Sequence, residues 1–301
     1  MNKKSLKFIY LKLILMAFFW GGTFIAGRVA AQGVGPFSGA FLRFAIASIF
    51  LFLLVWRVEG ELPALGKRQL IPLILLGMTG VFAYNVFFLK GLKIISAGRA
   101  SLIIANNPVF IALFAAFIFK EKLNTVKTAG IIISVTGAII VISRGNLGEI
   151  MNGGLGLGEL YIFFCVASWV TYSLIGKSIM SGLSPLISVT YSSLLGTLAL
   201  FIPACFEGMF HDLPHYSAPE WLSIFFLGFF GTVLASVWYY EGIKAIGAIK
   251  AGQFINLVPV SAILLAFFIL GEPVSLSLVV GGLLVISGVY MTNKTRQKII
   301  A

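Results

Sequence analysis

The chain has 301 residues, of which 59% are hydrophobic and only 11% are charged, and its mean hydropathy is +1.03. This composition excludes a soluble globular domain, in which about a quarter of the residues are charged. The net charge of +12 does not indicate a nucleic-acid-binding surface, because the basic residues fall in short clusters between apolar runs. The sequence therefore predicts an all-α integral membrane protein.

Ten apolar runs have about the 20 residues that a helix needs to cross the hydrocarbon core of a bilayer. In the first half we expect membrane-spanning helices at 11–31, 37–58, 70–89, 97–119 and 125–143. In the second half we expect them at 157–180, 184–206, 219–240, 248–270 and 275–292. The first run follows three lysines, as a signal peptide does, but it is long and no small-residue cleavage site follows it. We interpret it as a retained helix.

The second half of the chain repeats the first with an offset of 151 residues. From Leu76 to Gly137 this gapless offset gives 19 identities in 62 positions. Because each half contains five spans, an odd number, matching helices must cross the membrane in opposite directions. The sequence therefore predicts two inverted five-helix repeats that share one interior, at residues 1–145 and 157–301, joined by an outer linker at 146–156.

The basic residues predict the orientation of the chain in the membrane. If the amino terminus is cytoplasmic, 16 of the 22 lysines and arginines fall on the cytoplasmic side. Cytoplasmic loops of membrane proteins carry such an excess of positive charge. We therefore expect a multi-pass protein of a bacterial-type inner (plasma) membrane with both termini in the cytoplasm.

Two prolines at matching positions, Pro108 and Pro259, lie about 11 residues into their spans and so near the bilayer midplane. Proline lacks an amide hydrogen and loosens the preceding helical turn, so both are predicted hinges. Four amide side chains lie beside these breaks: Asn106, Asn107, Gln253 and Asn256. Because an unpaired amide in hydrocarbon costs several kcal/mol, they should face the protein interior, either lining a solute cavity or only bridging the kinked helices.

Aromatic side chains form a second group of candidates. Trp20 and Trp169 lie nine to twelve residues inside their spans, at comparable places in the two repeats, where anchoring at the membrane interface explains them poorly. They either line a cavity or pack tightly between helices, and rings with one polar atom suit amphipathic solutes. Four more aromatic residues fall within predicted spans or at their ends, where anchoring at the membrane interface is the ordinary alternative to lining a cavity: Tyr84, Tyr172, Trp238 and Tyr239.

Charged residues inside the spans are rare, and Arg43 is the exception. An arginine at the centre of a span costs about 2.5 to 3.5 kcal/mol, so its side chain should turn inward or reach the interface. It either attracts an acidic or zwitterionic solute or has a structural role, and Glu159 is a candidate partner. Glu121 and Glu272 end matching helices, where we expect each to cap the amino terminus of the helix that follows.

The chain also resembles the EamA family of the drug/metabolite transporter superfamily. The matching motifs are Trp20-Gly21-Gly22-Thr23-Phe24, Arg43-Phe44, Ser168-Trp169, Pro108 with Glu121 and Gly130, and Pro259 with Glu272 and Gly281. The resemblance implies ten helices in two repeats and the export or import of small organic solutes, often amino acids or related metabolites, through a central cavity. It also implies a structural role for Arg43, because an arginine is common at this position in the family.

Two other classes of membrane protein are open alternatives, an intramembrane enzyme and a passive channel or scaffold. The inventory of residues argues against an enzyme, because Asp212, His211 and His215 all fall in one predicted outer loop. No phosphate-binding glycine motif occurs, so we do not expect ATP to drive transport. These loop residues could bind zinc, but a solvated loop is the ordinary interpretation.

Cys165 and Cys205 are expected to be buried thiols, with a disulfide between them as the alternative. A channel would differ from a carrier in flux that does not saturate.

We therefore expect a permease or exporter of small organic metabolites that works by alternating access through a central midplane cavity. The expected partners are the lipid bilayer and a small solute, without nucleic acid, metal or cofactor, and pairing with a second copy is left open. The candidate substrate-binding residues are Trp20, Thr23, Arg43, Tyr84, Asn85, Asn106, Asn107, Trp169, Tyr172, Trp238, Tyr239, Gln253 and Asn256.

Overall fold

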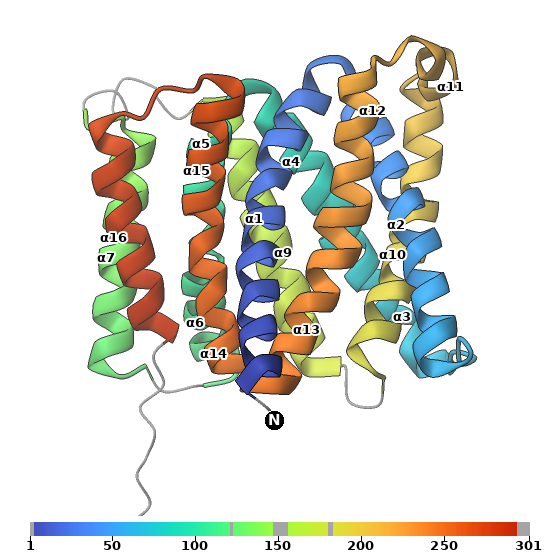
Figure 1. Cartoon of the computed structure of the whole chain (residues 1–301), viewed down its shortest axis with the longest axis horizontal. Coiled ribbons are helices and arrows are strands. Elements are labelled where there is room, and N and C mark those ends of the chain that lie inside the picture. The colour runs from blue at the N-terminus through green and yellow to red at the C-terminus, as the bar shows by residue number, and fades with distance from the viewer. Residues whose placement is uncertain (1–2, 121–122, 147–155, 180–182, 294–301) are drawn as a thin grey trace, which may run out of the picture.

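The computed structural model describes residues 3–120, 123–146, 156–179 and 183–293, and every regular element in these ranges is a helix (Figure 1). Ten spans in these ranges are long and apolar enough to cross a membrane. The prediction of ten transmembrane helices is therefore confirmed. Glu121, Met180 and the linker residues 147–155 lie outside the described residues.

The first five spans contain seven helical segments and one wide π-helical segment. They are α1 (Lys3–Gly33), α2 (Pro36–Glu59), α3 (Lys67–Leu76) running through η1 (Gly77–Ala83) into α4 (Tyr84–Ile94), α5 (Ala97–Ile104) with α6 (Asn107–Ile118), and α7 (Thr125–Ile142). Side-chain oxygens cap the amino-terminal ends of several of these helices. Ser96 accepts a hydrogen bond from the amide of Arg99 at the start of α5, and Asn124 accepts one from the amide of Lys127 at the start of α7.

The second five spans follow the same plan. They are α9 (Leu157–Ile179), α10 (Pro185–Phe206), α12 (Ala218–Phe225) running through η3 (Phe226–Leu234) into α13 (Ala235–Ile246), α14 (Ala248–Gln253) with η4 (Phe254–Asn256) and α15 (Leu257–Leu270), and α16 (Leu276–Asn293). Two short helices, α11 (Met209–Asp212) and η2 (Leu213–His215), form the loop before α12. Both repeats thus have a wide π-helical turn in the third span and a break in the fourth.

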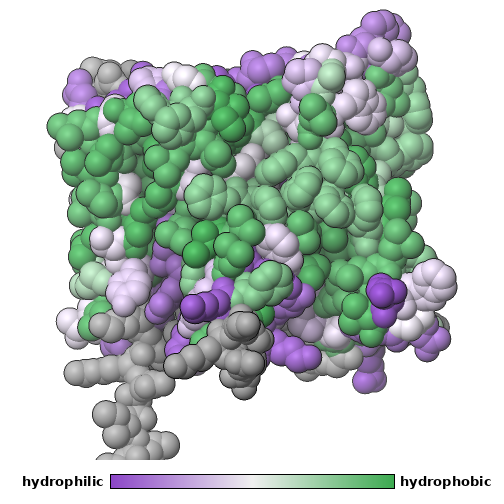
Figure 2. Space-filling model, in the orientation of Figure 1, coloured by the Kyte–Doolittle hydropathy of each residue, from purple (hydrophilic) through white to green (hydrophobic). Residues whose placement is uncertain are grey.

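The surface of the molecule matches a bilayer. Apolar residues cover most of its height, and polar residues gather at the upper and lower edges of the view (Figure 2). Large side chains such as Phe117, Phe206 and Phe268 are 85%, 89% and 76% exposed, which is stable only where lipid surrounds them. The chain is therefore a multi-pass membrane protein. We call the face with the amino terminus in Figure 1 the lower face and the opposite one the upper face.

The first helix of each repeat packs against the other repeat. Helix α1 lies along α12, α13 and α15 of the second repeat, and α9 lies along α4, α5 and α6 of the first. Equivalent helices of the two repeats also pair with each other, α2 with α10 and α7 with α16. Small residues permit the closest of these pairings, since the backbones of Gly130 and Gly288 face each other directly. The two repeats therefore share one interior.

Carboxylates hold the repeats together at the helix ends. Glu207, after α10, accepts hydrogen bonds from the amides of Phe37 and Ser38 at the start of α2, at 3.3 and 2.7 Å. On the lower face, Ser184 before α10 donates to Glu59 at the end of α2, at 2.5 Å. Hydrogen bonds to a carboxylate therefore join the antiparallel helices α2 and α10 at both ends. Each carboxylate lies beside the amino-terminal end of the other helix, where the helix dipole favours a negative charge.

The expected cap by Glu272 is corrected by the structure. Its carboxylate accepts from the amides of Ala97 and Gly98, at 2.8 and 3.1 Å, and so caps α5 of the other repeat and not the helix that follows it. The amino terminus of α16 is capped by the hydroxyl of Ser275, which accepts from the amide of Leu278. A contact between distant segments has replaced the local one, so Glu272 fastens one repeat to the other at the upper face.

Candidate functional site

Three polar side chains meet in the interior where α2 passes the wide turns of both repeats. The guanidinium of Arg43 donates to Asn85 Oδ1 at 2.7 Å and to Thr232 Oγ1 at 3.1 and 3.3 Å. Asn85 follows η1 of the first repeat, and Thr232 lies within η3 of the second. Arg43 therefore joins the third span of one repeat to the third span of the other.

The wide turns explain why these polar groups can be satisfied inside the membrane. Asn85 Nδ2 donates to the carbonyls of Gly80 and Val81 in η1, and Thr232 Oγ1 donates to the carbonyl of Leu227 in η3. In a π-helical turn the backbone bond spans one more residue than in an α-helix, and such turns are frequent at functional sites. The guanidinium of Arg43 is charged, whereas its partners Asn85 and Thr232 are neutral.

We expect Arg43→Lys to lower the free energy of unfolding by about 1–1.5 kcal/mol, because an ammonium lacks the planar fork that reaches Asn85 and Thr232 together. The measurement is thermal or denaturant unfolding of the purified protein in detergent. Arg57→Lys, at an exposed position on the lower end of α2, is the control and should change stability by less than about 0.5 kcal/mol. Equal effects of both changes would show that the fork has no structural role.

The candidate aromatic residues form two separate clusters, one for each repeat's first helix. Trp169 of α9 lies 5.3 Å from Tyr84 of α4 and stacks on Tyr172 at 5.2 Å, measured between ring centroids. Trp20 of α1 lies 5.4 Å from Tyr239 of α13, and its indole Nε1 donates to the carbonyl of Gly231 at 3.0 Å. Each tryptophan thus contacts a tyrosine of the opposite repeat.

Two further candidates, Trp238 and Thr23, lie next to the aromatic cluster of Trp20 and Tyr239. Trp238 stacks on Phe19 at 5.4 Å between centroids, on the side of α13 that faces α1. Thr23 is buried, and its hydroxyl donates to the carbonyl of Trp20 at 2.6 Å. The methyl of Thr23 also lies close to Gly231, so this residue fills the contact between α1 and η3.

The broken fourth spans place the four amides differently. Both polar atoms of the Asn106 side chain have a partner, since Nδ2 donates to the carbonyl of Leu102 at 2.9 Å and Oδ1 accepts from Ser134 Oγ at 2.7 Å. Asn107 is 92% buried, and its Oδ1 has no hydrogen-bond partner among the described residues. In the second repeat Asn256 is half-buried and Gln253 exposed. Both breaks precede their prolines, at Ala105–Asn106 before Pro108 and at η4 before Pro259.

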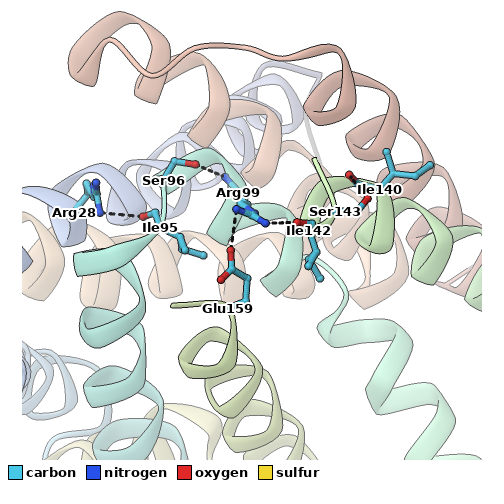
Figure 3. A network of polar contacts seen from close by, with 8 residues as sticks. All are labelled: Arg28, Ile95, Ser96, Arg99, Ile140, Ile142, Ser143 and Glu159. Atoms are coloured by element: carbon cyan, nitrogen blue, oxygen red, sulfur yellow. Dashed lines mark hydrogen bonds and ion pairs between the residues drawn. The ribbon is translucent and has the colours of Figure 1, made fainter. Parts of the chain in front are cut away.

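An ion pair joins the repeats near the upper face. Arg99 of α5 lies 2.8 Å from Glu159 of α9, measured from Nη1 to Oε1, and the two side chains are only 10% and 5% exposed. Arg99 also donates to the carbonyl of Ile142 at the end of α7, so that one guanidinium ties three helices together (Figure 3). The expected partner of Glu159, Arg43, is therefore corrected to Arg99, because the amino-terminal end of α9 lies against α5.

A polar recess of about 420 Å³ opens on the upper face, between the end of α1 and the residues around the start of α12. Arg28, Glu220 and Glu272 line it together with Gln32. The guanidinium of Arg28 donates to the carbonyl of Ile95 (Figure 3) and to that of Leu92, at the carboxyl-terminal end of α4. On the lower face, Lys12 of α1 pairs with Glu241 of α13 at 2.5 Å, with side chains 19% and 41% exposed. Ion pairs between the repeats thus lie near both faces.

The structure brings together Arg43 with Asn85, Trp169 with Tyr84 and Tyr172, and Trp20 with Tyr239. It does not place all the candidates around one enclosed space. Sequence reasoning missed Thr232 and the contact of Arg99 with Glu159. The signals for them were a hydroxyl within an apolar run and two opposite charges at span ends.

The histidine loop and the two cysteines are the remaining candidates for metal binding and thiol chemistry. No group of three or more histidine, cysteine or acidic side chains lies close enough to hold a metal there. His211 contacts Asp212 on the exposed loop at 3.0 Å. Cys165 and Cys205 are both free thiols, and Cys165 is buried, donating to the carbonyl of Tyr84 at 3.5 Å.

The fold defines a polytopic membrane protein built from two inverted five-helix repeats, an architecture of secondary transporters. A family model described as the EamA-like transporter family matches residues 7–143 and again residues 156–294. The chain belongs to this family, and the predicted class, a transporter, is confirmed.

Several relatives carry the name of transporters. The chain is 31% identical to the uncharacterized transporter YyaM of Bacillus subtilis over 281 residues, covering 93% of this chain and 92% of the relative. It is 27% identical to a probable terminal-alkyne amino-acid exporter of Streptantibioticus cattleyicolor, covering 94% and 92%. A solved crystal structure has the same fold, with a TM-score of 0.62 at 19% identity and coverage of 94% of this chain and 96% of that one.

Proposed function

We propose that the protein carries small organic metabolites, such as amino acids, across the membrane by alternating access, and that it acts neither as an enzyme nor as a passive channel. The observation that carries this proposal is the matched pair of contacts between repeats, Trp20 with Tyr239 and Trp169 with Tyr84. Each contact joins the first helix of one repeat to the third span of the other. When the repeats rock against each other, one of these equivalent contacts can open while the other closes. The relative named as a probable amino-acid exporter supports this class of solute.

In this mechanism the repeats correspond to residues 1–145 and 157–301, and the lower face is cytoplasmic because it carries the excess of basic residues. The breaks before Pro108 and Pro259 let the two halves of each fourth span move independently. The contacts of Arg99 with Glu159 and of Glu272 with α5 hold the upper side closed. The aromatic clusters and Asn107 hold the solute near the midplane, and the polar recess on the upper face is the mouth of the second state.

Reconstituted protein in liposomes provides the direct test. With a panel of radiolabelled amino acids, we expect saturable uptake that Trp20→Ala, Asn107→Ala and Trp169→Ala each reduce at least about tenfold, since each removes a contact of about 1.4 kcal/mol or more from the bound solute. Trp56→Ala, at a position 66% exposed to lipid, is the control and should leave uptake unchanged. Unaltered uptake in all three variants would show that the solute binds elsewhere, and uptake that never saturates would identify a channel.

The hinge proposal has a separate test. We expect the double variant Pro108→Ala with Pro259→Ala to bind solute with unchanged affinity but to carry it several times more slowly, because continuous fourth spans resist bending. Affinity is measured by thermal stabilisation, which reaches about 2.7 kcal/mol at 100 times the dissociation constant. Pro72→Ala, at another proline within a helix, is the control. An unaltered rate of uptake in the double variant would contradict the hinge role.

A further inference from the structure

The polar recess on the upper face brings together charges of both signs from distant parts of the chain. Arg28 lies near the end of α1, Glu220 in the first turn of α12, and Glu272 just after α15. Among the described residues, neither carboxylate forms an ion pair with Arg28, although all three line the same space of about 420 Å³. One positive and two negative charges thus border a recess large enough for a small molecule without neutralising each other directly.

Neighbouring groups fix these side chains but use only part of their polar atoms. Glu220 Oε2 accepts from the amide and the hydroxyl of Ser217, at 2.6 and 2.8 Å, and Arg28 donates through Nη1 alone. Glu220 Oε1 and the Nε and Nη2 atoms of Arg28 have no hydrogen-bond partner among the described residues. None of these three atoms is among the buried unpaired atoms of the chain, so water or a ligand can reach them.

An amino acid carries the charges that complement this recess. Nε and Nη2 lie on one edge of the Arg28 guanidinium, so a carboxylate can accept from both in parallel. An ammonium has three N–H donors, and its acceptors are Glu220 Oε1 and the oxygens of Glu272, each of which accepts only one backbone amide. Apolar side chains complete the wall of the recess: Val29, Pro219 and Leu270.

We propose that the polar recess binds zwitterionic amino acids with an aliphatic side chain, whose carboxylate accepts from Arg28 and whose ammonium donates to Glu220 and Glu272. This inference rests on the proposed transport function and names its solute class at the place where the solute enters or leaves the upper side. The head group of phosphatidylethanolamine carries the same pair of charges, and the test separates this lipid from a free amino acid.

Protection of a cysteine at the recess tests the site. Gln32 is exposed and lines the recess, so Gln32→Cys places a thiol there, in a Cys205→Ser background that removes the half-buried native thiol. The reaction with a polar maleimide is followed in phosphatidylcholine nanodiscs, with Cys205→Ser alone as the blank. We expect leucine to slow the reaction severalfold and saturably, because the bound amino acid covers the thiol. Equal rates with and without leucine would overturn the proposal.

Two analogues of leucine test the need for both charges. Leucinamide lacks the carboxylate and isocaproate lacks the ammonium, so neither should protect the thiol at concentrations at which leucine does. Protection by leucinamide equal to that by leucine would overturn the role of Arg28, and equal protection by isocaproate would overturn the role of the two carboxylates.

Two conservative variants test the residues themselves. Glu220→Gln removes the charge but can still complete the capping box with Ser217, and Arg28→Lys keeps the charge but lacks the planar fork. Each should raise the leucine concentration for half protection about tenfold, the effect of one lost charge-assisted hydrogen bond. Asp212→Asn removes a charge from the same face outside the recess and should leave it unchanged. An equal rise in all three variants would overturn the site.

Phosphatidylethanolamine nanodiscs separate the two sources of the charges. We expect the same reaction rate and the same protection by leucine as in phosphatidylcholine, whose head group lacks a primary ammonium. A slower reaction in phosphatidylethanolamine that leucine no longer changes would overturn the proposal and identify a binding site for the lipid head group.

Transport measurements separate this inference from the function on which it rests. Saturable uptake of leucine by a protein whose Gln32→Cys thiol leucine does not protect would overturn the recess as a binding site and leave the carrier function in place. Protection of the thiol by leucine without saturable uptake of any amino acid would support the site and contradict the carrier function.

Discussion

Replacing Glu159 by glutamine is expected to lower the free energy of unfolding by about 3–5 kcal/mol, because it removes the carboxylate that lies 2.8 Å from the buried guanidinium of Arg99. Both side chains are almost fully buried, so water cannot take over the role of the carboxylate. Unfolding of the purified protein in detergent, followed by circular dichroism or by intrinsic fluorescence, measures the change.

The lower face supplies a matched control for this ion pair. Glu241→Gln removes the same charge from the contact with Lys12, but that carboxylate is 41% exposed and its pairing is screened, so we expect a loss of at most about 1 kcal/mol. The double variant Arg99→Met with Glu159→Leu should recover most of the lost stability, because it removes both charges of the buried pair. Equal losses for Glu159→Gln and Glu241→Gln would contradict the buried character of the upper pair.

Gly288→Ala is expected to lower the free energy of unfolding by about 3 kcal/mol, the upper part of the range for overpacking. The added Cβ would lie within 2.5 Å of the carbonyl oxygen of Gly130 and within 2.7 Å of the Ser134 side chain, and backbone atoms cannot move away as side chains can. Helices α7 and α16 would have to separate along the seam where the last spans of the two repeats meet. Thermal unfolding measures the effect.

Gly282→Ala on the same helix is the control. Its Cβ would meet only the side chain of Leu102, at 3.4 Å, an ordinary contact. Since alanine is favoured over glycine inside a helix, this change should be neutral or should stabilise the protein by about 0.5–1 kcal/mol. A loss of stability at Gly282 as large as that at Gly288 would contradict the assignment of the effect to the seam between α7 and α16.

The sequence predicted the spans, the repeat and the family, because these depend on local or regular signals. Runs of about 20 apolar residues are required by the thickness of the bilayer, and the 151-residue offset is visible without any structure. The expected ends of the spans agree closely with α2, α7, α10 and the segment from the start of α14 to the end of α15. Breaks in the fourth spans were also expected from the chemistry of proline.

The partners of the polar groups depended on the tertiary structure. Arg43 and Glu159 were candidate partners in sequence, yet Arg43 contacts Asn85 and Thr232, and Glu159 contacts Arg99. Pairing inside a membrane protein follows from which helices are neighbours, and hydropathy does not specify that arrangement. The π-helical turns were also missed. They contain Gly77 and Gly228, where the backbone of another helix approaches closely, and this approach depends on the tertiary arrangement.

The sequence by itself thus determined how often the chain crosses the membrane and that its halves are inverted copies, because the bilayer imposes a length on each apolar run and an odd number of spans reverses the second copy. Only the tertiary structure decided that α1 and α15 meet closely while α6 and α9 leave a groove. The reason is steric: a Gly21–Ser261 contact brings two helices together, whereas Val170 and Phe110 at the equivalent places keep them apart.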